Sequence, residues 1–190
     1  VPMDIMTILG SPRKRGNTAA VLGLFEDLAG SAHQIERVNI ADHTVKGCLG
    51  CSACQRIEEE PGCSQDDDAV GLFVRMIATD VVVYATPLYA WDFSAQMKAL
   101  IDRQYCLVKW GEGPEPSALL AGKRVALLVT CAGPVEDNAD VIQVVFDRSM
   151  EYSRCEVVGK YIVPHCTTPE ELGDKAERTA RQMLADIVGG

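Results

Sequence analysis

Residues 3–18 of the chain read MDIMTILGSPRKRGNT. Residues 3–9 are apolar enough to predict a buried strand, which the turn Gly10-Ser-Pro ends. A helical pattern then runs from about residue 18 to residue 28. The loop between them carries three consecutive basic residues, Arg13, Lys14 and Arg15. This segment therefore predicts a strand, a loop and a helix in succession.

Strand and helix patterns alternate along the rest of the chain. We expect strands at residues 35–40, 80–86, 124–130 and 156–163, and helices at residues 70–77, 94–108, 137–152 and 169–188. Asp66, Asp67 and Asp68 suit the N-cap and first turn of the helix that follows them. Five strand–helix pairs with continuous apolar strands predict an α/β fold, with a doubly wound parallel sheet and helices on both faces.

Size and charge limit the function classes. The chain has 190 residues, with 27 acidic residues against 18 basic ones and a net charge of -9. A chain of this length buries about 70% of its unfolded surface, so we expect one domain over residues 1–190. The negative charge argues against nucleic acid as a partner, and no apolar run approaches the roughly 18 residues of a membrane span. No signal peptide is visible, so we expect a cytoplasmic protein.

Ligands of doubly wound sheets bind outside the carboxyl ends of the strands, so the loops at those ends are candidate sites. In the first loop, Ser11, Arg13, Asn17 and Thr18 would surround a phosphate together with backbone N–H groups at the start of the helix. The loop contains neither the Gly-x-Gly-x-x-Gly nor the Gly-Lys-Ser/Thr pattern. A basic run is commonly a solvated turn, but its place after the first strand favours phosphate binding.

Two further loops lie at strand ends. Residues 86–92 contain Pro87, which fixes a turn, and Tyr89 and Trp91, whose flat faces suit a planar ring. Trp91 fits a subunit interface equally well. Residues 130–134 contain Gly133, where backbone could approach a ligand closely or turn into a helix.

Eight cysteines are present. The expected core or near-core thiols are Cys106, Cys131, Cys155 and Cys166. The other four, Cys48, Cys51, Cys54 and Cys63, fall in a long loop at about residues 41–66, and a loop of that length is usually functional.

These motifs together resemble the NAD(P)H-dependent FMN reductase and iron-sulfur flavoprotein family. The similar parts are the Ser-Pro-Arg-x-x-Gly-Asn-Thr loop, the Gly-Cys-x-Gly-Cys-x-x-Cys segment, the Thr-Pro-x-Tyr loop and the helix with Lys98, Asp102 and Arg103. The resemblance covers nearly the whole chain. It implies a flavodoxin-like fold with strand order 2-1-3-4-5, FMN as cofactor and NAD(P)H as co-substrate.

The resemblance also implies roles for single residues. Ser11, Arg13, Asn17 and Thr18 would hold the FMN phosphate, and Pro87, Leu88, Tyr89 and Trp91 would border the isoalloxazine. With the remaining loop residues, the expected cofactor contacts are Ser11, Arg13, Gly16, Asn17, Thr18, Thr86, Pro87, Leu88, Tyr89, Trp91, Thr130 and Gly133. We expect no catalytic acid or base, because hydride transfer to flavin needs none.

Members of this family commonly dimerise with the flavin near the interface, so we expect a homodimer or homotetramer. Trp91 and Tyr105 are candidates for either the flavin site or the interface. Lys98, Asp102 and Arg103 are expected to serve packing or the interface.

The cysteine run suits an iron-sulfur cluster. Three thiolates at Cys-x2-Cys-x2-Cys spacing reach the corners of one [4Fe-4S] cubane, and Cys63 would be the fourth ligand. Eight residues, 55–62, separate it from Cys54, which is a longer spacing than in the iron-sulfur flavoproteins that the segment resembles. Free thiols, a redox-active pair and zinc stay open as alternatives.

The cluster decides between two functions. Without it, the chain is an NAD(P)H-dependent reductase of free flavin, a quinone or another small acceptor. With it, electrons pass between ferredoxin or a similar carrier, the cluster and FMN. A non-catalytic flavodoxin-like electron carrier or redox sensor is a third hypothesis, and a structural protein with an empty crevice is a fourth.

Overall fold

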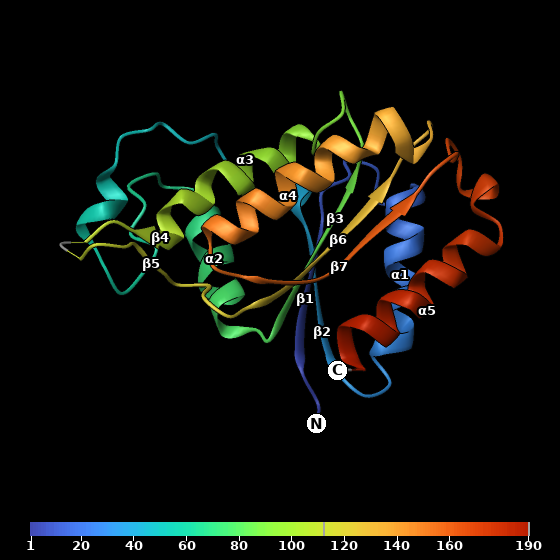
Figure 1. Ribbon diagram of the computed structural model, residues 1–190, viewed down its shortest axis with the longest axis horizontal. Coiled ribbons are helices and arrows are strands. Elements are labelled where there is room, and N and C mark those ends of the chain that lie inside the picture. Colours follow the sequence, from blue (N-terminus) through green and yellow to red (C-terminus); the bar gives the residue numbers. More distant parts are fainter. Residues whose placement is uncertain (112, 190) are drawn as a thin grey trace.

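The computed structural model describes residues 1–111 and 113–189. Its main sheet has five parallel strands in the order β2-β1-β3-β6-β7 (Figure 1). The strands are β1 (Asp4–Leu9), β2 (Gln34–Asn39), β3 (Val81–Pro87), β6 (Arg124–Thr130) and β7 (Glu156–Val163). Counted within this sheet alone, the order is 2-1-3-4-5, so the predicted flavodoxin-like topology is confirmed.

The long helices cover both faces of the sheet (Figure 1). One face carries α1 (Asn17–Ala29) and α5 (Asp174–Val188), and the other carries α2 (Ala69–Ala78), α3 (Ala95–Arg103) and α4 (Asp140–Tyr152). Successive strand residues point to opposite faces, so Ile5 and Leu9 enter the core beneath α1 while Met6 and Ile8 enter the other one. This double burial is why the strands are apolar without alternation.

The helix expected at residues 94–108 is shorter than predicted. Ser94 caps α3 by accepting a hydrogen bond from the Met97 N–H (3.2 Å), and α3 ends at Arg103. A 3-10 turn at Gln104–Leu107 follows, and then β4 (Val108–Lys109) pairs antiparallel with β5 (Ser117–Ala118). Sequence periodicity missed this hairpin because each of its strands has only two residues.

The last two helices also begin later than predicted. Residues expected to open the helix at 137 form the kinked turn Val135–Ala139, where Asp137 has a φ of 55°, and α4 starts at Asp140. The segment expected to be helical from residue 169 is a 3-10 turn at Pro169–Leu172 followed by α5. Gly173, with a φ of 46°, separates the two.

Two of the three consecutive acids, Asp67 and Asp68, bind parts of the chain distant from the helix that they were predicted to cap. Asp68 is the N-cap residue of α2, but its carboxylate accepts the Thr44 N–H (2.7 Å) rather than capping the helix. Asp67 accepts the Ala69 N–H (3.1 Å) and also binds Arg103. Both acids therefore attach the long cysteine-containing loop to the start of α2.

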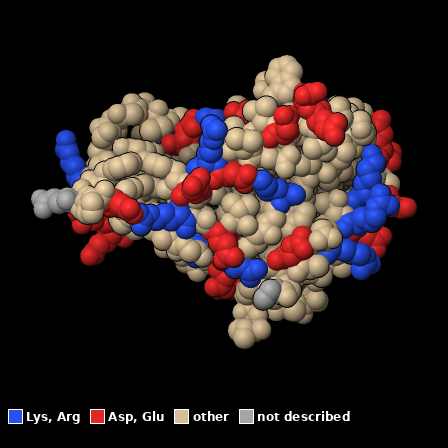
Figure 2. All heavy atoms as spheres, viewed as in Figure 1, with Lys and Arg blue, Asp and Glu red and all other residues tan. Residues whose placement is uncertain are grey.

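The surface carries charges of both signs. Figure 2 shows acidic and basic side chains interspersed over one face of the molecule. Exposed ion pairs within single helices include Lys98 with Asp102 on α3 (2.6 Å) and Arg181 with Glu177 on α5 (2.6 Å). Every helix in residues 1–111 and 113–189 is too short or too polar to cross a membrane.

Candidate functional site

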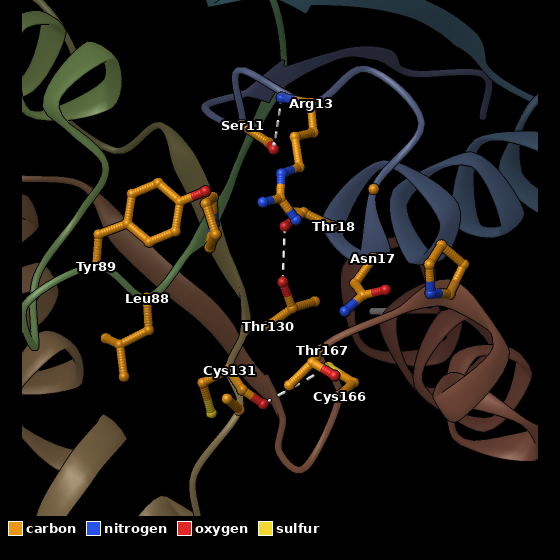
Figure 3. Close-up of a pocket in the computed structure, with 14 residues that line it drawn as sticks. Ser11, Arg13, Asn17, Thr18, Leu88, Tyr89, Thr130, Cys131, Cys166 and Thr167 are labelled. Carbon is orange, nitrogen blue, oxygen red and sulfur yellow. Dashed lines mark hydrogen bonds between the residues drawn. The ribbon is translucent and has the colours of Figure 1, made fainter.

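A pocket opens at the carboxyl ends of β1, β3, β6 and β7 (Figure 3). This position follows from the topology, because the chain moves to opposite sides after β1 and β3 and leaves a crevice there. The residues that line it are Ser11, Arg13, Gly16, Asn17, Thr18, Pro87, Leu88, Tyr89, Thr130, Cys131, Ala132, Cys166, Thr167 and Pro169. Nine of the twelve predicted cofactor contacts are among them.

One end of the pocket is suited to an anion. The Ser11 hydroxyl accepts the Arg13 N–H (3.1 Å), and the Arg13 carbonyl accepts the Gly16 N–H (3.1 Å), which holds the loop in a turn. No side chain caps α1 at Gly16, so the N–H groups of its first turn are available to a ligand. The Arg13 guanidinium points into the same space (Figure 3).

Three polar side chains line the pocket beyond this loop. The hydroxyls of Thr18 and Thr130 are 2.7 Å apart and join the start of α1 to the end of β6. Asn17 Oδ1 is buried and has no hydrogen-bond partner among the described residues. A buried acceptor without a partner is uncommon in folded proteins, and a ligand hydroxyl would satisfy it. The phosphate-binding groups fit the phosphate of FMN, and Asn17 Oδ1 beside them fits a hydroxyl of its ribityl chain.

The opposite wall of the pocket is apolar. Leu88 N–H donates to the Thr130 carbonyl (2.9 Å), and Tyr89 and Asp92 exchange two backbone hydrogen bonds of 3.0 Å. Ala90 and Trp91, between them, have positive φ values of 49° and 63°. This tight turn presents the half-exposed Tyr89 ring to the pocket (Figure 3). An aromatic ring beside Pro87 and Leu88 suits the flat face of an isoalloxazine.

Three predicted cofactor contacts lie outside the pocket wall. Thr86 is fully buried, where its hydroxyl donates to the Pro87 carbonyl (2.9 Å) and accepts the Ser94 N–H (3.1 Å). Trp91 is 60% exposed, and the Gly133 carbonyl accepts the His165 N–H (3.3 Å). Contact of these three residues with the cofactor stays a prediction.

Five further residues line the pocket: Cys131 and Ala132, which lie in the candidate loop at residues 130–134, and Cys166, Thr167 and Pro169, which follow β7 and which the sequence analysis missed. The Cys166 N–H donates to the Cys131 carbonyl (3.1 Å) and joins the ends of β6 and β7. Burial raises the pKa of the Cys131 thiol to about 11, so this thiol is protonated near neutral pH. The loop after the last strand lies at a strand carboxyl end like the other three, and that rule would have found Cys166 and Thr167.

A second, smaller cavity gathers the cysteines of the long loop. All four predicted ligands line it, together with a fifth thiol, Cys106, which follows α3. Cys48 and Cys51 are exposed, whereas Cys54 and Cys106 are buried. Tyr105, expected at the flavin or an interface, lines this cavity and not the pocket at the strand ends.

A buried ion pair holds one side of this cavity. Arg103 Nη1 and Nη2 bind the two carboxylate oxygens of Asp67 at 2.7 and 3.0 Å, and both side chains are excluded from solvent. The same two side chains bind the backbone of Lys46 through its carbonyl (3.0 Å) and its N–H (2.9 Å). Arg103 therefore has the packing role predicted for it, and the pair fixes the chain just before Cys48.

Thiol electrostatics differ across the cavity. Hydrogen bonds from the Ala53 N–H and the Ser64 hydroxyl lower the pKa of Cys51. Burial, together with the neighbouring thiols of Cys63 and Cys54, raises the pKa of Cys106 to about 12. Arg103 Nε is buried beside the cavity without an acceptor among the described residues. The Arg103 guanidinium acts on the Cys63 thiol, and a guanidinium that lines a cavity of thiols fits an anionic sulfur-containing group.

The described residues contain no three Cys, His, Asp or Glu side chains grouped around a single metal ion. Thiolates on a cubane bind different irons, so they lie farther apart than the ligands of one ion. For a cluster, the relevant observation is therefore that all four cysteines line one cavity.

The chain is similar to flavin-dependent proteins in sequence and in fold. The family model described as NADPH-dependent FMN reductase matches residues 3–146. An iron-sulfur flavoprotein of Archaeoglobus fulgidus is 31% identical over 97% of this chain and 79% of its own length. An iron-sulfur flavoprotein of Methanosarcina thermophila is 34% identical over 55% of this chain and 54% of its own length. The solved NAD(P)H:quinone oxidoreductase of Methanothermobacter marburgensis has a TM-score of 0.70 at 16% identity, covering 96% of this chain and all of the other, a likeness of fold.

Proposed function

The chain belongs to the NADPH-dependent FMN reductase family, and from this premise we propose that it is an FMN-dependent oxidoreductase that takes electrons from NADPH or NADH. The observation that carries the proposal is the pocket at the strand ends, with an anion-binding loop at one end and an aromatic wall at the other. FMN likewise has an anionic phosphate at one end and a flat aromatic ring at the other.

The proposal assigns each part of the pocket a task. Ser11, Arg13, Gly16, Asn17 and Thr18 bind the phosphate and the first ribityl hydroxyls. The arrangement is supported by the uncapped start of α1 and by the unpartnered Asn17 Oδ1.

The remaining residues orient the ring. Pro87, Leu88 and Tyr89 hold one face of the isoalloxazine, and Thr130 closes the pocket where β6 ends. When bound, FMN supplies the group that accepts hydride from a nicotinamide and delivers electrons to free flavin, a quinone or another small acceptor. The protein's part is to orient the ring and limit water at its buried face, and no side chain needs to move a proton.

Anaerobic stopped-flow mixing tests this proposal. Excess NADPH or NADH should bleach the absorbance of the bound flavin, and an added quinone should restore it. If neither nicotinamide bleaches the flavin, the reductase proposal fails, and a non-catalytic electron carrier or redox sensor becomes the better description.

A second candidate function is favoured by the cysteine cavity. We propose that Cys48, Cys51, Cys54 and Cys63 bind a [4Fe-4S] cluster that exchanges electrons with FMN and with a ferredoxin or similar carrier. The proposal is supported by the shared cavity and by the similarity to an iron-sulfur flavoprotein over most of both chains. About four irons and four sulfides per chain after anaerobic purification, lost in Cys48→Ala, would support it. Flavin without iron would refute it.

We also propose that the chain forms a homodimer or homotetramer. Support comes from the half-exposed Tyr89 and the 60% exposed Trp91, which leave an aromatic surface beside the pocket. Light scattering on the flavin-loaded protein should give two or four chain masses, and a monomer at micromolar concentration would refute the proposal. The expected cytoplasmic location stays a prediction.

A further inference from the structure

The spacing of the fourth cysteine is the unusual feature of the cysteine segment. Residues 55–62 separate Cys54 from Cys63, and they include the exposed residues Arg56, Glu58, Glu59 and Glu60. The one large aliphatic side chain of this insert, Ile57, lies close to Gly62 near its other end. Both cysteines nevertheless line one cavity.

A single side chain joins the two ends of this insert. Lys109 Nζ donates to the carbonyl of Cys54 (2.9 Å) and to the carbonyl of Pro61 (3.1 Å). These carbonyls stand just before and just after residues 55–60. The ammonium therefore closes the insert into a loop and returns the chain to the cavity, two residues before Cys63.

The strand that carries Lys109 is bound to the same segment by a second side chain. Gln55 Nε2 donates to the Val108 carbonyl (3.0 Å), and Gln55 Oε1 accepts the Trp110 N–H (3.0 Å). These bonds flank Lys109 on both sides along β4. Because β5 pairs with β4, these bonds attach the cysteine segment to the small two-stranded sheet.

The charge of Lys109 is the second observation. The side chain is 2% exposed, and its ammonium makes no ion pair among the described residues, in contrast to Arg103, which Asp67 neutralises. The acidic groups that act on this ammonium are the thiols of Cys106, Cys54 and Cys63 and the carboxylate of Glu60. A buried ammonium held only by neutral carbonyls is costly unless negative charge lies nearby. The exposed Glu60 carboxylate supplies part of it, and thiolate ligands in the adjacent cavity would supply more.

We propose that Lys109 is a positioning residue of the cysteine site: its ammonium pins both ends of residues 55–60, brings Cys63 to the cavity that Cys54 lines, and compensates the negative charge of a cluster bound there. The inference rests on the proposed iron-sulfur site for its charge component. Its positioning component concerns the insert alone and holds with or without iron.

The experiment compares Lys109→Met, which removes donor and charge, with Lys109→Arg, which keeps both. In Lys109→Met we expect iron to be lost to a chelator about ten- to hundred-fold more readily, as is typical when a partner that orients metal ligands is removed. The remaining cluster should have a lower midpoint potential, because reduction adds negative charge that Lys109 no longer offsets. A tenfold change in the one-electron equilibrium corresponds to about 59 mV. Lys109→Arg should restore both values.

Limited proteolysis of metal-free protein tests the positioning component by itself. Trypsin should cut after Arg56 faster in metal-free Lys109→Met than in metal-free wild type, because the insert is no longer closed, and Lys109→Arg should reverse the change. Lys123 provides the matched control, since its ammonium also binds two carbonyls, those of Ile77 and Thr79, beside the amino end of β6. Lys123→Met should change neither the cleavage after Arg56 nor the potential.

The experiments distinguish failure of the proposed cluster from failure of the inference about Lys109. If wild type binds no iron, the proposed cluster fails, and the trypsin comparison on that protein still decides whether Lys109 closes the insert. Iron retention, potential and cleavage all unchanged in Lys109→Met would overturn the inference. If that variant does not fold, Lys109→Gln, which keeps a neutral donor, takes its place: lower potential with slow cleavage supports the charge component, and wild-type values for both overturn it.

Discussion

The pocket at the strand ends and the cysteine cavity are built by different kinds of contact. The pocket walls are the residues that follow parallel strands, so the sheet places them at one edge. The cavity walls are held by a few side chains from distant parts of the chain, chiefly Arg103 with Asp67 and Lys109 with residues 54 and 61. The pocket should therefore tolerate the loss of one side chain, whereas the cavity should depend on each of its supports.

Replacing Arg103 should have the largest effect. In Arg103→Met the Asp67 carboxylate stays buried without its partner, and we expect the free energy of unfolding to fall by about 3–5 kcal/mol. Urea unfolding measures this change. Replacing both partners, Asp67→Asn with Arg103→Met, should recover part of the loss, because no buried charge then remains.

The matched control is Arg181→Met on α5, where the pair with Glu177 is exposed. Its removal should change the stability by less than about 0.5 kcal/mol. Equal losses in the two variants would show that burial of the Arg103 pair does not support the cysteine segment.

Binding of FMN should stabilise the protein without changing how the cysteine segment is held. At FMN concentrations about 100 times the Kd, the free energy of unfolding should rise by about 2.7 kcal/mol. Trypsin cleavage after Arg56 in the folded protein should keep its rate, because the insert is held by Lys109 and Gln55 and not by the pocket. A slower cleavage with FMN would mean that the two regions are coupled.

Arg13→Ala should weaken FMN binding by roughly tenfold, about 1.4 kcal/mol. The expected loss is at the low end for a charged hydrogen bond, because Arg13 is exposed and solvent screens its charge. Flavin fluorescence titration gives the Kd. Lys14→Ala in the same loop is the control, since Lys14 pairs with Asp42 (2.5 Å) outside the pocket, and its Kd should equal that of wild type.

The same contrast explains what could be predicted from the sequence. Strands such as residues 124–130 are apolar throughout because both sheet faces are covered, and that pattern is visible in a single sequence. Their order places the loops at residues 10–18 and 86–92 together. Nine of twelve expected contacts accordingly line the pocket.

The supports of the cysteine cavity could not be predicted in this way. Lys109 lies in a two-residue strand, 48 positions after Pro61, and no periodicity connects them. Asp67 appears in a run of three acids that suits a helix start equally well. Long-range bonds between single side chains leave no local pattern, so the sequence showed the cysteines but not what holds them.

The smallest expected effect is the pH dependence of the Asp67 contribution. Burial would raise the pKa of Asp67, but hydrogen bonds from Arg103 and from the Lys46 and Ala69 N–H groups hold it below its ordinary value of 3.8. A carboxyl with a lowered pKa stabilises the folded state above the unfolded pKa, and this contribution is lost as the pH falls through the folded pKa. The stability gap between wild type and Asp67→Asn should therefore stay constant between about pH 7 and pH 5 and narrow below about pH 3.8. Because burial opposes the bonds, the change is small. Urea unfolding at several pH values measures it, and a gap that widens in acid would mean that burial outweighs the bonds at Asp67.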